Sequence, residues 1–241
     1  MSESRVSRGT LYLIPVTLGG EDARTLLPIV TLDIVRRLDT FVVENAKSAR
    51  AFLKAAGHPR PLQEIQLHAL DEHTKEREIE PLLAPLLAGK DCGLMSEAGC
   101  PAVADPGAAL VRRAHESGIA IVPLVGPSSI LLALMASGMD GQRFAFHGYL
   151  PVEKAERARK LKELEREARK ATQIFIETPY RNAAMLQALL EHCREDTLLC
   201  IATDLTLPGG TVETRSIAQW KKKPPALDRR LVVFLIYGAN R

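Results

Sequence analysis

The first half of the chain alternates between strand-like and helix-like patterns of apolar residues. Residues 11–16 form a continuous apolar run, which is typical of a parallel strand buried on both faces. Apolar residues at four-residue spacing from Leu26 to Leu38 predict a helix over residues 25–37, with Pro28 in its first turn, where a missing N–H is tolerated. Further strands are predicted at 40–43, 64–67, 93–95 and 119–124, and further helices around 51–53, at 79–87 and at 108–116. This alternation indicates an α/β fold with a parallel, doubly wound sheet.

The pattern starts again at residues 126–129, where a Gly-Pro-Ser-Ser segment precedes an apolar helix-like run and predicts an N-capped helix. We place a domain boundary just before it, which gives a first domain over 1–124 and a second over 125–241. In the second domain, strands are predicted at 144–149, 173–177, 197–203 and 231–237, and helices at 130–134, 153–170 and 182–192. The sequence therefore predicts two α/β domains.

Residues 92–107, with the sequence CGLMSEAGCPAVADPG, are the stretch around which the chain is organised. An apolar run leads into small residues, then Pro and Gly, as expected of a buried strand that ends in an irregular loop. Small side chains let a ligand approach the backbone closely, and in open α/β sheets ligands sit at the carboxyl ends of the strands. We interpret this loop as the floor of a binding site. The alternative is a tight strand-to-helix connection that binds nothing.

Composition narrows the class of protein. Apolar residues make up 46% of the 241 residues, enough for a core without disulfides, and the net charge of +3 permits a polyanionic partner without arguing for one. The four cysteines form no C-x-x-C pair, which is against a metal site and favours reduced thiols. We see no signal peptide and no apolar run of about 20 residues, so we expect a cytoplasmic protein outside the membrane. The charged helix at 153–170 could touch RNA phosphates, but a solvated face is the commoner case.

Two absent motifs restrict the ligand. No G-x-G-x-x-G follows the first strand, and no G-x-x-x-x-G-K-[ST] segment is present. A nucleotide-like ligand would therefore lack a phosphate chain. S-adenosylmethionine fits that description, although these absences alone do not select it.

Several segments, in this order, carry a resemblance to a known family: Gly9–Tyr12, Glu44–Lys47, Ser96–Pro101, Ala104–Gly107, Pro123–Ser129, Ala136–Gly138 and Glu177–Arg181. Together they resemble the tetrapyrrole methylase superfamily, and most nearly its 16S rRNA ribose 2′-O-methyltransferases. The resemblance implies a parallel sheet in the first domain, a mixed sheet in the second, S-adenosylmethionine in the inter-domain cleft, and a homodimer.

The resemblance also assigns residues. The cofactor would be bound by Pro15, Ser96, Glu97, Ala98, Gly99, Val103, Asp105, Ser128, Ser129, Thr178 and Leu205. This chain departs from the rRNA branch at residues 16–20 and at 44–47, where Glu-Asp-Thr-Arg becomes Glu-Asn-Ala-Lys, and it ends about where that branch would begin a small helical domain. These departures concern the acceptor side more than the cofactor side.

Glu44, Lys47 and Asp105 are the candidate catalytic residues, because a ribose hydroxyl must lose its proton during methyl transfer. For each of them a helix cap or a surface ion pair is the alternative. Tyr180 and Arg181 could stack on and pair with a nucleotide of the substrate, or could be ordinary surface residues at a helix start. A nucleophilic Cys100 is not favoured, because no His is near in sequence.

Three functions remain open at this point: a methyltransferase of RNA, a methyltransferase of a small molecule such as a tetrapyrrole, and a cofactor-binding protein without turnover. The first is our main prediction. We expect S-adenosylmethionine as cofactor, RNA as a possible substrate, a homodimer, and no metal.

Overall fold

The computed structural model describes residues 7–20 and 22–238, and the chain divides into two compact units, residues 1–128 and 129–241. Each unit has its own sheet of five strands. We describe the two units separately.

The sheet of unit 1 is entirely parallel. Its strands are β1 (Thr10–Leu13), β2 (Thr40–Val43), β3 (Gln66–Ala69), β4 (Cys92–Met95) and β5 (Ala120–Pro123). They lie in the order β3-β2-β4-β1-β5, so β4 is central and flanked by β2 and β1. All four residues of β2 and of β4 are buried, as expected where helices cover both faces. The parallel sheet predicted for the first domain is therefore confirmed.

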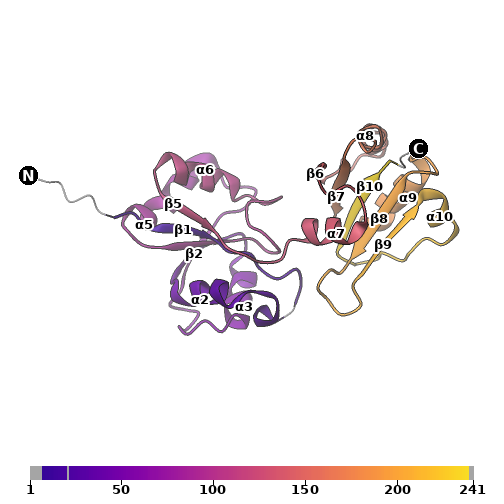
Figure 1. The fold of residues 1–241 in the computed structure, drawn as a ribbon. Helices are drawn as coiled ribbons and strands as arrows, with labels where there is room; N and C mark the ends of the chain where they lie inside the picture. Colours follow the sequence, from indigo (N-terminus) through magenta and orange to yellow (C-terminus); the bar gives the residue numbers. More distant parts are fainter. Residues whose placement is uncertain (1–6, 21, 239–241) are drawn as a thin grey trace, which may run out of the picture. The chain divides into compact units, whose positions relative to one another are not determined.

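Helices cover both faces of this sheet. They are α1 (Ala23–Leu26), α2 (Ile29–Arg37), α3 (Ala46–Ala55), α4 (Glu76–Ile79), the 3₁₀ helix η1 (Glu80–Leu83), α5 (Ala84–Leu87) and α6 (Ala108–Glu116). In Figure 1, α6 lies on one side of the sheet, and α2 and α3 lie on the other. Phe41 and Val43 face the side of α2 and α3, whereas Val42 and Leu94 face the side of α6.

Prolines divide two helices that the sequence predicted as continuous. The helix predicted at 25–37 is broken, because Leu27 is extended (φ −99°, ψ 139°) before Pro28, as the residue preceding a proline tends to be. The helix predicted at 79–87 is three short pieces, with Pro81 in the first turn of η1 and Pro85 in the first turn of α5. Both predictions placed helix in the right part of the chain, but each wrongly made the helix continuous.

Unit 2 contains a mixed sheet. Its strands are β6 (Phe144–Tyr149), β7 (Thr172–Glu177), β8 (Leu198–Thr203), β9 (Thr211–Ser216) and β10 (Val232–Tyr237). The order is β6-β7-β10-β8-β9; β6 and β7 are parallel and the other pairs are antiparallel. The predicted mixed sheet is confirmed. The sequence missed β9 because its polar residues give no apolar run, and it also missed the short helix α10 (Ile217–Lys222).

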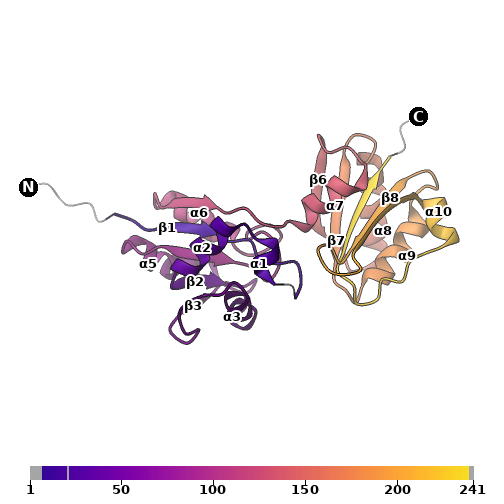
Figure 2. The same cartoon turned by 60° about the horizontal axis from the view of Figure 1, so that its bottom comes forward.

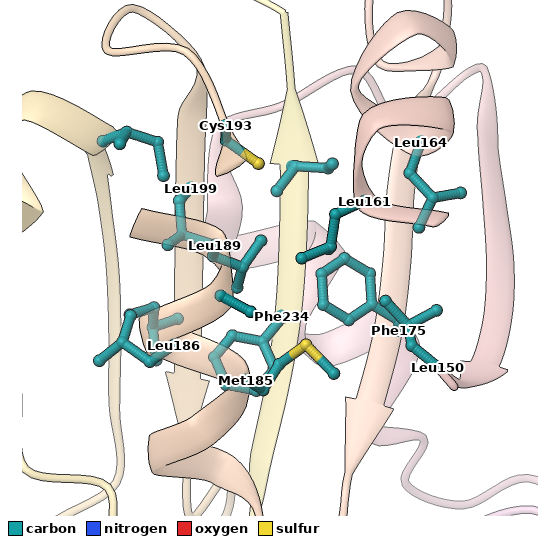
Figure 3. Packing of buried hydrophobic residues seen from close by; sticks show 14 of the residues in the cluster. Leu150, Leu161, Leu164, Phe175, Met185, Leu186, Leu189, Cys193, Leu199 and Phe234 are labelled. Carbon is teal, nitrogen blue, oxygen red and sulfur yellow. The ribbon is translucent and has the colours of Figure 1, made fainter. Parts of the chain in front are cut away.

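Both faces of the mixed sheet are packed, unequally. α8 (Lys154–Glu167), α9 (Asn182–His192) and α10 cover one face. Figure 3 shows Leu161 of α8 and Met185 of α9 beside Phe175 and Phe234 of the sheet, whose rings stack with centroids 5.8 Å apart. The helix α7 (Ser129–Ser137) packs on the opposite face through a smaller cluster (Figure 2).

Candidate functional site

The ends of β1 and β4 are joined by backbone hydrogen bonds beyond the strands themselves. Ile14 N donates to Leu94 O (2.9 Å), and Val16 N donates to Gly99 O (2.9 Å), where the two segments form an antiparallel bridge. The segment after β4 therefore turns back along the end of β1. This places residues 96–99 at the carboxyl edge of the parallel sheet, where α/β proteins bind their ligands.

The loop between β4 and α6 has an unusual backbone. Gly99 has φ +71°, and Ala102 and Ala104 both have φ +65°. This left-handed region costs an L-residue with a Cβ about 1–2 kcal/mol, so the two alanines hold the loop in a strained shape. Val103 lies between them with 45% of its surface exposed, a high value for an apolar side chain. The sequence suggested small residues here and gave no sign of the two left-handed alanines.

Two hollows lie on either side of Ser96. A narrow crevice is lined by Glu44, Ser96, Asp105 and apolar neighbours. A larger cavity of about 240 Å³ is lined by Ser96 and Glu97, by one side of α3, and by Val16, Thr17, Gly19 and Gly20. Ser48 and Glu97 both line this second cavity, and Ser48 Oγ donates a hydrogen bond to Glu97 Oε1 (3.3 Å). Ser96 thus lines both hollows, at the end of the central strand.

The crevice contains two carboxyl groups whose pKa values are raised. Burial raises the pKa of Glu44 most, the nearby charge of Asp105 raises it further, and a hydrogen bond from the Glu97 backbone opposes the shift. Burial also raises the pKa of Asp105, although the neighbouring Ser96 hydroxyl lowers it in part. Glu44 Oε2 and Ser96 Oγ are buried without a hydrogen bond of regular geometry. The crevice therefore favours carboxyl groups that bind a proton more readily than in water.

The segment after β2 orders the start of α3. Asn45 is its N-cap: its side-chain oxygen accepts from Lys47 N (2.8 Å) and Ser48 N (3.4 Å). Lys47 is exposed on the first turn and does not line the crevice. The sequence did not single out Asn45 or Ser48 as structural partners, although Asn before a helical run is a recognisable cap signal.

The remaining predicted residues of unit 1 lie around this edge. Pro15 is buried, and a Cβ built on Gly126 would lie 2.5 Å from the Pro15 Cβ, so only glycine fits there. Cys100 Sγ lies 3.6 Å from Pro127 O, and burial raises the pKa of its thiol, which disfavours the thiolate. Ser128 lies near this thiol, and its hydrogen bond partly opposes the shift. Ala98 is exposed beside the buried Gly99.

Unit 2 brings Thr178 and Leu205 to one edge of its own sheet. Glu177 and Thr203, the last residues of β7 and β8, both pair with Val232 at the start of β10, so the residues that follow them lie at the same edge. The side chain of Leu205 packs on the cluster beneath α7. Ser129 is the first residue of α7.

The charged groups at this edge of unit 2 are paired. Glu177, whose side chain is fully buried, accepts from Arg181 Nε (2.8 Å). Asp204 accepts from Arg230 Nε (2.6 Å) and from Leu231 N (2.8 Å). The sequence predicted Arg181 as a substrate contact and missed both pairs; Glu177 and Arg181 are only four residues apart, whereas Asp204 and Arg230 are brought together by the fold.

Other kinds of site find no support in the described part of the chain. Residues 7–20 and 22–238 contain no group of three or more His, Cys, Asp or Glu side chains placed to hold a metal ion. Within the same residues, no helix has the length and apolar character needed to cross a bilayer.

The chain is similar to known methyltransferases in sequence and in fold. Residues 10–220 match the family model described as Tetrapyrrole (Corrin/Porphyrin) Methylases. Ribosomal RNA small subunit methyltransferase I of Escherichia coli O157:H7 is 30% identical, with 96% of this chain and 79% of that protein covered. The enzyme of the same name from Xylella fastidiosa is 33% identical over 87% of this chain and 73% of that protein. In fold, the crystal structure of the methyltransferase CobJ matches with a TM-score of 0.62, at 18% identity, over 97% of this chain and 96% of that one.

These similarities confirm the family that the sequence motifs suggested. The named relatives and the family model define the class of protein: this chain is a methyltransferase. The chain belongs to the tetrapyrrole methylase family.

Proposed function

We propose that this protein transfers a methyl group from S-adenosylmethionine to a ribose 2′-hydroxyl of small-subunit ribosomal RNA. The relatives that carry the rRNA methyltransferase name support the substrate, since 96% of this chain aligns with one of them. The observation that carries the proposal is the edge of unit 1, where a buried carboxylate oxygen, Glu44 Oε2, has no hydrogen-bond partner within the described part of the protein. Unsatisfied buried groups are costly, so a bound ligand that satisfies them gains affinity.

The residues present fit S-adenosylmethionine. Ser96 has a buried hydroxyl to offer, Ala98 and Gly99 add little bulk, and Val103 offers an exposed apolar side chain. Bound there, the cofactor would supply an electrophilic methyl group on a sulfonium. We extend the proposed cofactor contacts to Pro15, Glu97 and Ser128 in unit 1, and to Ser129, Thr178 and Leu205 in unit 2.

We assign proton removal to the carboxyl pair of the crevice. A ribose hydroxyl must lose its proton as it attacks, and a carboxylate whose pKa is raised accepts a proton more readily than an ordinary one. Glu44 is the better candidate, because its Oε2 has no partner while Asp105 lies near the Ser96 hydroxyl. Asp105 would keep the pKa of Glu44 raised through charge repulsion. Lys47 is exposed outside the crevice, and we propose for it a contact with RNA rather than a role in proton transfer.

We also propose that the enzyme is a homodimer and works in the cytoplasm, where ribosomal RNA is found. The edge strand β6 carries exposed aromatic residues, with Phe144 43% and Tyr149 54% exposed, whereas the other edge strand of the same sheet, β9, is polar and charged. An apolar edge strand is a ready site for pairing with another chain. Sedimentation equilibrium should give twice the monomer mass, and a pure monomer at micromolar concentration would contradict this part.

The acceptor can be tested by incubating the protein with methyl-labelled S-adenosylmethionine and, separately, small-subunit rRNA or a tetrapyrrole precursor. We expect label in the RNA alone. Label only in the small molecule would show that the small molecule, and not RNA, is the acceptor. Cofactor binding without methyl transfer to either would contradict an enzymatic role.

A further inference from the structure

Tyr180 is presented in an unusual way. With 85% of its surface accessible, it is more exposed than any other large hydrophobic side chain in the described part of the chain. It stands at the carboxyl edge of the unit 2 sheet, in the same turn as Thr178. A single exposed aromatic residue is by itself ordinary, and what distinguishes Tyr180 is how its turn is held.

The turn that carries Tyr180 is fixed on both sides. Arg181 N donates to Thr178 O (2.9 Å), closing a four-residue turn with Pro179 in its second position, where its fixed φ is favourable. Before the turn, Glu177 Oε1 accepts from Thr178 N (2.6 Å) and Arg181 Nε (2.8 Å). Hydrogen bonds between neighbouring residues therefore hold the backbone around Tyr180.

The residue after the turn is anchored as well. Asn182, the first residue of α9, is fully buried, and its Nδ2 donates to Arg230 O (2.7 Å). Both anchors are expensive: Glu177 Oε2 and Asn182 Oδ1 are buried without a partner. The backbone on both sides of Tyr180 is thus anchored, with two buried oxygens left unsatisfied.

The guanidinium of Arg181 is part of these contacts. Its Nε and one terminal nitrogen both contact Glu177 Oε1, the latter at 2.5 Å, and only 30% of the side chain is exposed. The charge of Arg181 is offset by the buried carboxylate of Glu177. Arg181 is therefore suited to hold the turn rather than to bind a phosphate.

We propose that Tyr180 is a stacking platform for an unpaired base of the RNA substrate, and that Arg181 is a positioning residue that acts through Glu177. A tyrosine side chain on an anchored backbone has only two torsions to order, so it loses little conformational entropy on binding, and base stacking tolerates any sequence. This inference rests on the proposed RNA methyltransferase function and adds the substrate contact that unit 2 would make.

The test is RNA affinity as a function of salt, measured with unmodified small-subunit rRNA transcribed in vitro, beside calorimetric affinity for S-adenosylmethionine. Stacking on one aromatic side chain accounts for about 5- to 100-fold in affinity. We expect Tyr180→Ala and Tyr180→Leu to weaken RNA binding within that range, with unchanged cofactor affinity. Tyr180→Phe and Tyr180→Trp should bind RNA like the parent protein.

The slope of log affinity against log salt separates the two roles, because each lost phosphate contact reduces it by about 0.7–0.9. Arg181→Gln and Glu177→Gln should weaken binding by similar factors without changing the slope, and Tyr180→Ala combined with Arg181→Gln should be no worse than Tyr180→Ala. A reduced slope in Arg181→Gln would overturn its positioning role.

Three results would overturn the role of Tyr180. One is wild-type affinity in Tyr180→Ala while the parent protein binds and methylates RNA, in which case the proposed function survives. Another is a Tyr180→Ala variant that loses affinity for assembled small subunits but not for naked RNA, which would mean that Tyr180 contacts a ribosomal protein instead. If the parent protein neither binds nor methylates RNA, the proposed function fails and this inference falls with it.

Discussion

The carboxyl groups at the carboxyl edge of the unit 1 sheet have no cationic partner in the part of the chain that the structure describes, whereas those at the corresponding edge of unit 2 are paired with arginines. In unit 1, Glu44 and Asp105 share a crevice and form no ion pair among the described residues, and burial and the charge of Asp105 raise the pKa of Glu44. In unit 2, Glu177 and Asp204 are each held by an arginine. Unpaired carboxyl groups suit proton transfer, whereas paired ones fix the backbone around them. The difference suggests that chemistry belongs to unit 1 and presentation to unit 2.

The largest effect should come from Gly99→Val. Gly99 has φ +71°, where a β-branched residue is strongly strained, and a Cβ there would lie 3.3 Å from Leu18 Cδ2. We expect at least a hundredfold loss of S-adenosylmethionine affinity by calorimetry, with a smaller loss for Gly99→Ala. Gly141→Val is the matched control, because a Cβ at Gly141 meets nothing within 4 Å. Unchanged affinity in Gly99→Val would remove this loop from the cofactor site.

Glu44→Gln should come next. General-base catalysis contributes about 10²- to 10⁴-fold, so we expect a loss of that order in the rate of methyl transfer with cofactor affinity little changed. Asp105→Asn should lose less, because its proposed role is to raise the pKa of Glu44. Lys47→Ala, outside the crevice, should weaken RNA binding and leave the rate at saturating substrate unchanged. Equal rates for Glu44→Gln and the parent protein at saturating substrate would exclude Glu44 as the base.

In unit 2, removing a charged side chain at the edge of the sheet should lower the stability of the fold rather than the rate of methyl transfer. Arg230→Ala removes the partner of Asp204, whose side chain is only 21% exposed, and we expect a loss of about 1–3 kcal/mol in the free energy of unfolding. Arg24→Ala breaks an exposed, solvent-screened pair with Asp22 and should cost much less stability. Urea unfolding measures both, and equal small losses would show that the two edges do not differ in this way.

The smallest effect concerns pH. Because the folded-state pKa of Glu44 lies above its ordinary value of 4.5, the folded chain binds this proton more tightly than the unfolded chain does. The stability that this provides is complete below pH 4.5 and is lost as the pH rises through the folded-state pKa. Glu44→Gln should therefore flatten the decline in melting temperature above pH 4.5. A steeper decline in the variant would contradict the sign of the shift.

The sequence predicted most of the fold, because buried parallel strands leave continuous apolar runs and glycine marks their ends. It failed where prolines interrupt a helical period, as at Pro28, and where an edge strand is polar, as in β9. The family motifs located the loop after β4. They did not reveal the left-handed Ala102 and Ala104, because that shape depends on how the loop packs against its neighbours.

Burial explains what else the sequence left open. Glu44 looked the same as any carboxylate at a strand end until the fold showed its Oε2 without a partner. Arg181 looked like a free cation beside Tyr180, because the sequence does not show that the Glu177 side chain is fully buried beneath it.

The most direct measurement is the position of the transferred methyl group. The protein is incubated with methyl-labelled S-adenosylmethionine and unmodified small-subunit rRNA, and the RNA is then hydrolysed completely with alkali. A methyl group on a ribose 2′-oxygen blocks cleavage of the adjacent phosphodiester, so our account predicts label in an alkali-resistant dinucleotide. Label in mononucleotides would place the methyl group on a base, and unlabelled RNA would mean that it is not the acceptor; either result would contradict the account.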